Sequence, residues 1–174
     1  MNIKVHRGFD QIGGCITEIS TETSRVFIDF GQNLPGNGEP TTPEEDEALV
    51  THILAQNKKQ HEAVFYTHGH EDHVGLFEYI PEYVPQYMSE GTKGLLKIKY
   101  DVLYEGVNLK VNQLLDIGCD SQEYSDAINN LLYADNKCKL LNKIQVWKRT
   151  SPRKIPESIC IGDIMITPFF NCHS

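Results

Sequence analysis

Residues 67–75 read THGHEDHVG and bring three histidines and one aspartate, at positions 68, 70, 73 and 72, into six consecutive residues. Only seven histidines occur among the 174 residues, so chance is a poor explanation for three of them in this span. Neutral imidazole and carboxylate are ligands that Zn²⁺ and related divalent ions prefer. The alternative, in which the rings only form hydrogen bonds in a polar loop, would pack titratable groups together at a high cost. The pattern therefore predicts a metal site.

The flanking sequence places this cluster in a loop between a strand and a helix. Residues 63–66 form an apolar run of strand length, and Gly69 with its polar neighbours disfavours continuation of the strand. After the cluster, apolar residues at helical spacing predict a short helix that stops before Pro81. Upstream, Thr42 followed by a proline and two glutamates is typical of a capped helix start, and this helix is predicted to run to about Lys58.

The rest of the chain adds strands, one long loop and further helices. Segments rich in Ile, Val and Phe predict strands over residues 3–6, 14–19, 26–30 and 107–111. Helices are expected to open over residues 89–97 and to span residues 125–133, and the glycine- and proline-rich residues 31–41 predict a loop. The alternation around Gly162 and Asp163 predicts a tight hairpin. Together these elements predict an α/β fold of the α+β type, with a mixed sheet and flanking helices.

Composition bounds the class of protein. Twenty-four acidic against sixteen basic residues give a formal net charge of −8, which excludes a protein that holds nucleic acid mainly through uniform positive charge. The sequence holds no run of about 18 apolar residues and no apolar stretch typical of a signal peptide at its start, so we expect a cytoplasmic protein without a membrane partner. The five cysteines, an odd number without CxxC spacing, favour a reducing compartment.

One segment of the chain is locally basic. Residues 137–154 carry seven basic side chains and no acidic one, and Trp147 lies among them. Lys148 and Arg149 could follow a phosphate backbone while Trp147 stacks on a base. The same residues could instead form a solvated strand face, and the pattern favours this second interpretation.

The motif in residues 67–75 resembles the metal-binding signature of the metallo-β-lactamase fold superfamily, and its wording is most similar to the ribonuclease J type of metal-dependent hydrolases. Residues 12–14 resemble the glycine turn near the start of that family, and residues 26–31 (VFIDFG) resemble its first motif. Residues 161–169 resemble the family's hairpin, and His173 resembles the histidine of its third motif. The resemblance thus runs nearly from end to end.

The resemblance implies a two-metal centre. His68, His70 and His173 would hold one ion, and Asp72 and His73 would help to hold the other. Zinc is the expected metal, with manganese as an alternative. Cys172, directly before His173, is a soft side chain that could bind zinc or be oxidised, but we expect it to be a bystander.

The resemblance also implies a reaction. The metals would lower the pKa of a bound water so that hydroxide forms near neutral pH, Asp72 would orient that water, and Asp29 would support a metal ligand. The expected function is a metal-dependent hydrolase, most simply a phosphodiesterase that acts on RNA. Two alternatives stay open: hydrolysis of a thioester, lactam or lactone at the same centre, and a non-catalytic metal-binding or interaction subunit.

The family fold is a four-layer αβ/βα sandwich made of two similar halves. The resemblance makes residues 1–174 a single partial domain that corresponds to the first half, without the second half and without the β-CASP insertion of the nuclease branch. A sheet covered by helices on one face leaves an apolar face on the other. We therefore expect a homo-oligomer or a partner chain to cover that face.

Overall fold

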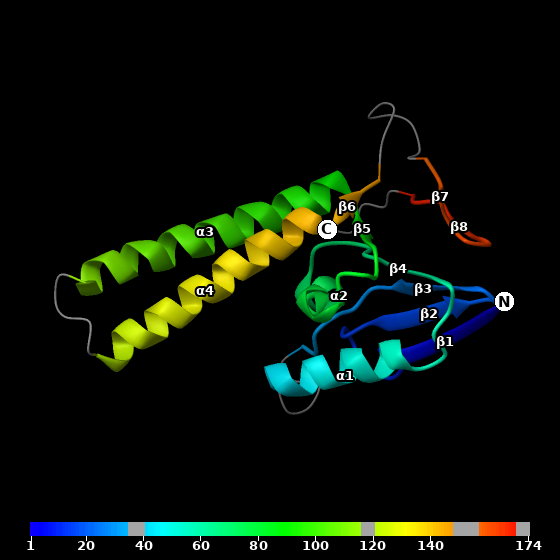
Figure 1. Ribbon diagram of the computed structural model, residues 1–174, viewed down its shortest axis with the longest axis horizontal. Helices are drawn as coiled ribbons and strands as arrows, with labels where there is room; N and C mark the ends of the chain where they lie inside the picture. Colours follow the sequence, from blue (N-terminus) through cyan, green and yellow to red (C-terminus); the bar gives the residue numbers. More distant parts are fainter. Residues whose placement is uncertain (35–40, 116–120, 148–156, 170–174) are drawn as a thin grey trace. The chain divides into compact units, whose positions relative to one another are not determined.

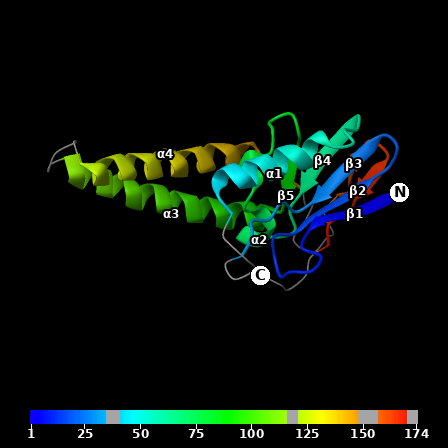
Figure 2. The same ribbon diagram turned by 90° about the horizontal axis from the view of Figure 1, so that it is seen from below.

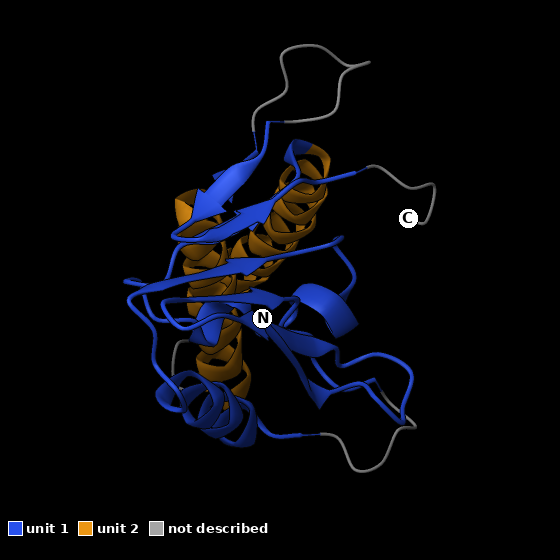
Figure 3. Cartoon of the chain, turned by 90° about the vertical axis from the view of Figure 1, so that its right-hand side faces the viewer, with its two compact units in different colours: residues 1–90, 145–174 blue, residues 91–144 orange. Residues whose placement is uncertain are grey.

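The computed structural model describes residues 1–34, 41–115, 121–147 and 157–169 (Figure 1). Over these ranges the chain is a mixed α/β protein with a six-stranded mixed sheet, a two-stranded sheet and four α-helices. The chain divides into two compact units, residues 1–90 with 145–174 and residues 91–144 (Figure 3). The mixed sheet with helices is confirmed, and the single partial domain over residues 1–174 stays a prediction.

The six-stranded sheet combines an antiparallel and a parallel part, with the strand order β1-β2-β3-β4-β5-β6. Its first three strands pair antiparallel: β1 (Asn2–Arg7), β2 (Ile16–Ser20) and β3 (Ser24–Ile28). From β3 onward neighbours are parallel: β4 (His61–Phe65), β5 (Gln86–Met88) and β6 (Gln145–Val146). The parallel part therefore aligns the carboxyl ends of β3 and β4, which is where ligands collect in sheets of this kind.

Helix α1 (Pro43–Ala55) confirms the predicted capped start. The amide of Glu45 donates to the Thr42 hydroxyl at 3.3 Å, and the Thr42 amide donates to the Glu45 carboxylate at 2.8 Å, which is a complete capping box. The helix ends at Ala55, earlier than predicted. Its C-terminal carbonyls accept hydrogen bonds from the fully buried Arg25 of β3, which also pairs with Glu62 at 2.5 Å.

The second face of the sheet is covered in part by a hairpin of the same chain. Strands β7 (Ile159–Ile161) and β8 (Ile164–Ile166) pair antiparallel around Gly162, which confirms the predicted hairpin. The hairpin isoleucines pack with Val26, Ala63 and Phe65 of the sheet. The expectation that this face finds no cover within the chain is therefore wrong for the part formed by these three residues.

The helical unit corrects one prediction and confirms another. Helix α3 (Glu90–Leu115) runs through residues 107–111, so the strand predicted there is wrong. Val107, Val111 and Leu114 pack at helical spacing against Ala127 of α4 (Gln122–Lys143), and this packing outweighs the strand preference of valine. The predicted helix over residues 125–133 is confirmed as part of the longer α4. Figures 1 and 2 show α3 and α4 side by side as a helical hairpin.

The length and hydropathy of the helices test whether any of them could cross a membrane. No helix in the described ranges combines the length and the apolar character that crossing a bilayer requires.

Candidate metal-binding site

The histidine motif follows the carboxyl end of β4 and enters the short helix α2 (Glu71–Val74). Three consecutive carbonyls of this segment accept hydrogen bonds from distant parts of the chain. The amides of Gln32, Cys15 and Phe30 donate to the carbonyls of residues 71, 72 and 73 at 2.8, 3.0 and 3.0 Å, respectively. The segments that follow β1 and β3 therefore hold the backbone of the motif in place.

Two glycines make this close approach possible. A Cβ atom on Gly31 would lie 1.7 Å from the carbonyl oxygen of Asp72, and one on Gly13 would lie 2.7 Å from the Asp72 carboxylate. Gly13 also has a φ of +77°, which side-chain-bearing residues rarely adopt. The two glycine-containing stretches singled out in the sequence thus pack directly against the motif aspartate.

The motif side chains converge as two donor pairs. Nε2 of His68 and Nδ1 of His70 face each other at 3.1 Å, and Nε2 of His73 lies 3.5 Å from Oδ2 of Asp72. The ring of His68 also lies 4.0 Å from that of His73, measured between centroids. Two ligands of a tetrahedral zinc ion stand roughly 3.3 Å apart, given Zn–N bonds of about 2.0–2.1 Å. Each pair therefore fits two corners of a metal site in both spacing and chemistry.

Neither pair is a complete coordination shell. Across the described part of the chain, no group of three or more His, Cys, Asp or Glu side chains is arranged to hold a metal ion. His173, which the resemblance implies as the third ligand of one ion, lies outside the described residues, as does Cys172. Assignment of the motif side chains to metals thus stays a prediction, supported by two pairs of suitably spaced donors.

Asp29 lies next to the motif, and its carboxylate contacts Thr67 and His73. It is buried at the end of β3 with a φ of 63°, a conformation that aspartate tolerates better than most residues. Its carboxylate accepts hydrogen bonds from the Thr67 amide at 2.7 Å and from Nδ1 of His73 at 2.8 Å. The hydrogen bond to Asp29 raises the pKa of His73 against the opposing effect of burial. Asp29 therefore fixes the proton on Nδ1 and turns Nε2 toward Asp72.

Two residues near the site escaped sequence reasoning. Arg7 donates from Nε to the Gly14 carbonyl at 2.9 Å and from Nη2 to the Gly31 carbonyl, so it fastens both glycine stretches. Thr67 joins Asp29 to the motif through its amide and hydroxyl. A threonine beside a histidine is a weak signal, and nothing near Arg7 in sequence indicates contacts with residues 14 and 31.

Of the three residues suggested for nucleic-acid binding, the structure describes only Trp147. Trp147 stacks on Phe65, with ring centroids 6.0 Å apart, as part of the apolar cluster on the sheet. Lys137 is buried, with Nζ 5.1 Å from the Tyr133 ring, so it is not available to a phosphate. Lys148 and Arg149 lie outside the described residues.

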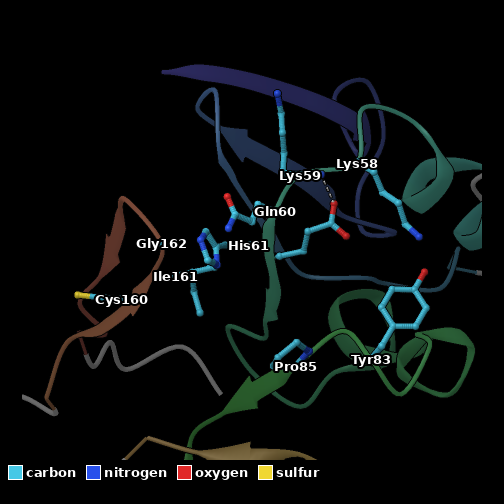
Figure 4. Close-up of a pocket in the computed structure, with 10 residues that line it drawn as sticks. Lys58, Lys59, Gln60, His61, Tyr83, Pro85, Cys160, Ile161 and Gly162 are labelled. Atoms are coloured by element: carbon cyan, nitrogen blue, oxygen red, sulfur yellow. Dashed lines mark hydrogen bonds between the residues drawn. The ribbon is translucent and has the colours of Figure 1, made fainter.

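A pocket of about 480 Å³ lies at the opposite end of β4 (Figure 4). Its lining includes Lys58, Lys59, His61, Tyr83 and Cys160, and Nζ of Lys58 stands 4.8 Å from the centre of the Tyr83 ring. A five-residue strand spans roughly 16 Å. The pocket is therefore separate from the histidine motif and contributes no side chain to it.

Known proteins offer distant similarity. No protein-family profile matches the chain. It is 29% identical over 97 residues to the transcription termination factor FttA of Thermococcus kodakarensis, an alignment that covers 52% of this chain and 15% of that protein. A crystal structure of a protein of unknown function from Enterococcus faecalis is similar at 28% identity and a TM-score of 0.47, over 57% of this chain and 28% of that one. The chain thus spans a minor part of the length of both proteins.

Proposed function

We propose that this chain provides the first half of a metallo-β-lactamase-type hydrolase that cleaves phosphodiester bonds of RNA with divalent metal ions. One observation carries the proposal: the His68–His70 and Asp72–His73 donor pairs converge at the carboxyl end of β4, with Asp29 holding His73. Two adjacent pairs of this kind suit a two-metal hydrolase better than a single structural zinc, which takes four ligands in one closed shell.

In this proposal each side chain has a defined task. His68 and His70 hold one ion together with His173, while Asp72 and His73 hold the other. Bound divalent ions supply Lewis acidity toward the phosphate and toward the attacking water. The Asp72 carboxylate orients the water, and Asp29 keeps the Nδ1 proton on His73 so that its Nε2 presents a lone pair.

The choice of RNA rests on the similarity of the motif sequence to the ribonuclease J type and on the match to FttA. FttA is described as a transcription termination factor, a role that concerns nucleic acid. The overall charge of −8 weighs little against RNA, because bound divalent ions neutralise phosphate charge locally. Thioesters, lactams and lactones are the competing substrates at the same centre.

Metal content is the first test. The dialysed chain should retain zinc or manganese when measured by mass spectrometry, and His68→Ala should lose it. His61→Ala is the matched control, because His61 is exposed and lies at the other end of β4. A wild-type chain without bound metal, or equal metal content in all three proteins, would contradict the proposed centre.

Substrate is tested separately with labelled RNA and with a panel of thioester, lactam and lactone substrates. RNA cleavage that His68→Ala abolishes and His61→Ala retains would support the proposal. Turnover of a thioester, lactam or lactone alone would overturn the RNA assignment. Tight metal binding without any turnover would instead favour a non-catalytic metal-binding subunit.

A further inference from the structure

Helix α3 carries an apolar stripe that its own hairpin does not use. Leu95, Ile98, Val102 and Leu109 are each 61–64% exposed, although all four are large hydrophobic residues. Their spacings of three, four and seven residues place them on one narrow face of the helix. The face that packs within the helical unit is formed by other residues, among them Val111 and Leu114. Helix α3 is therefore apolar on two sides, whereas a helix in a two-helix hairpin needs only one.

Glycines border the stripe. Gly94 and Gly106 lie inside α3, and a Cβ atom on either would meet nothing within 4 Å. A glycine in the interior of a helix lowers the stability of the helix relative to alanine. Neither glycine relieves crowding within the chain, so both leave bare backbone on which another helix can approach closely.

Charge distinguishes the helical unit from the rest of the chain. Residues 91–144 contain seven lysines and seven acidic residues, so their formal charge is zero. The remaining residues contain nine basic and seventeen acidic side chains and carry the whole net charge of −8. Two copies that met through the other unit would bring like charges together, and the helical unit is where this repulsion is weakest.

We propose that the stripe on α3 is the docking surface for a second copy of this chain, with α3 of one copy packed against α3 of the other. The repeat of Leu95, Val102 and Leu109 at seven-residue intervals is self-complementary, as two-fold association requires. Four such side chains from each copy bury on the order of 1,000 Å² in total, which reaches the lower limit for a specific interface.

The first test is the sedimentation of the full chain. The wild type should sediment as a dimer of a 19.8 kDa chain, and the double variant Ile98→Lys, Val102→Lys should sediment as a monomer. Leu132→Lys is the matched control, because Leu132 is 61% exposed on α4, outside the stripe, and this variant should stay dimeric. Far-ultraviolet circular dichroism establishes that all three proteins keep their helices.

A gain of affinity provides a second, independent test. Glu105 falls in the repeat between Val102 and Leu109, so Glu105→Leu completes the stripe and should tighten the dimer by at least about tenfold. Lys139→Leu adds the same side chain at an exposed position of α4 and should leave the affinity unchanged. A wild type that stays monomeric at about 100 μM, far above the micromolar range of small interfaces, would overturn the proposal. Dimers that persist in the Ile98→Lys, Val102→Lys variant would overturn it equally.

Discussion

Asp29 and His73 are 44 residues apart in sequence, yet the carboxylate of Asp29 accepts a hydrogen bond from Nδ1 of His73 at 2.8 Å. The contact is possible because β3 and β4 are parallel neighbours, so Asp29 and the motif both follow the carboxyl ends of their strands. A pair of this kind sets which ring nitrogen faces a ligand.

Asp29→Asn tests the hydrogen bond between Asp29 and His73. Asn is nearly isosteric with Asp and tolerates the same backbone conformation, so Asp29→Asn should preserve the fold while it weakens the hold on His73. We expect zinc affinity to fall by about 10–100-fold, measured by competition with a chelating dye. His61→Asn serves as control, and an unchanged affinity in Asp29→Asn would show that Asp29 has no part in metal binding.

The glycine next to the motif should not accept a methyl group. Gly31→Ala would place a Cβ atom 1.7 Å from the Asp72 carbonyl oxygen, which forces the backbone apart. Overpacking of this kind should lower the free energy of unfolding by about 3 kcal/mol or more. Gly94→Ala is the control, because its Cβ meets nothing within 4 Å in its own chain, and in dilute solution, where the chain is monomeric, it should raise stability by about 0.5–1 kcal/mol. Thermal melts of both variants decide the matter, and a Gly31→Ala protein as stable as wild type would contradict the packing described.

His6 should make stability depend on pH. Burial lowers the pKa of His6, against the opposing effect of its 2.8 Å hydrogen bond to Glu18. The unfolded chain therefore binds more protons at this position once the pH falls below about 6.5, so the folded state loses stability as pH falls from there toward the lower folded pKa. The difference in melting temperature between wild type and His6→Gln should change over this range. A constant difference between pH 8 and pH 5 would argue against a neutral His6 in the folded protein.

Asp163 anchors the hairpin turn to the sheet. Hydrogen bonds with Ser24, Thr21 and Thr23 lower the pKa of Asp163 from 3.8 to about 2. The contribution of this carboxylate to stability is therefore complete above the unfolded pKa and is lost as pH falls from 3.8 through about 2. Carbon-detected NMR titration of the Asp163 carboxyl group should report the low value, and Thr21→Val should raise it. A normal pKa in the wild-type protein would mean that the turn is not held to β3.

Local sequence signals located several elements because their causes are local. The capping box at Thr42 and the turn at Gly162 each depend on residues within a few positions, and both appear in the structure as predicted. The strand predicted over residues 107–111 was wrong because the packing of α3 against α4 outweighs the preference of valine. The two- and three-residue strands β6 and β5 give no periodic pattern, since only their place in the sheet defines them.

In the candidate site, too, some residues are recognisable from local sequence and others only from the fold. The motif histidines and Asp72 were recognisable because they cluster in sequence. Their support by Arg7 and Thr67 was not, because those contacts depend on how the chain returns to the end of β4. Trp147 shows the converse: its basic neighbours in sequence gave no sign that the ring packs on Phe65 in the apolar cluster of the sheet.

The three amide-to-carbonyl hydrogen bonds that fasten residues 71, 72 and 73 have a further consequence. They hold the backbone of residues 71–73 by contacts that need no ion, so this part of the histidine-bearing segment is ordered before a metal arrives. An ion entering this segment loses little of its binding free energy to ordering the loop. The amides of Cys15, Phe30 and Gln32 should therefore exchange slowly with deuterium even in the presence of a strong chelator. A metal ion would bind to and dissociate from a preformed site, and the fold would not depend on the ion.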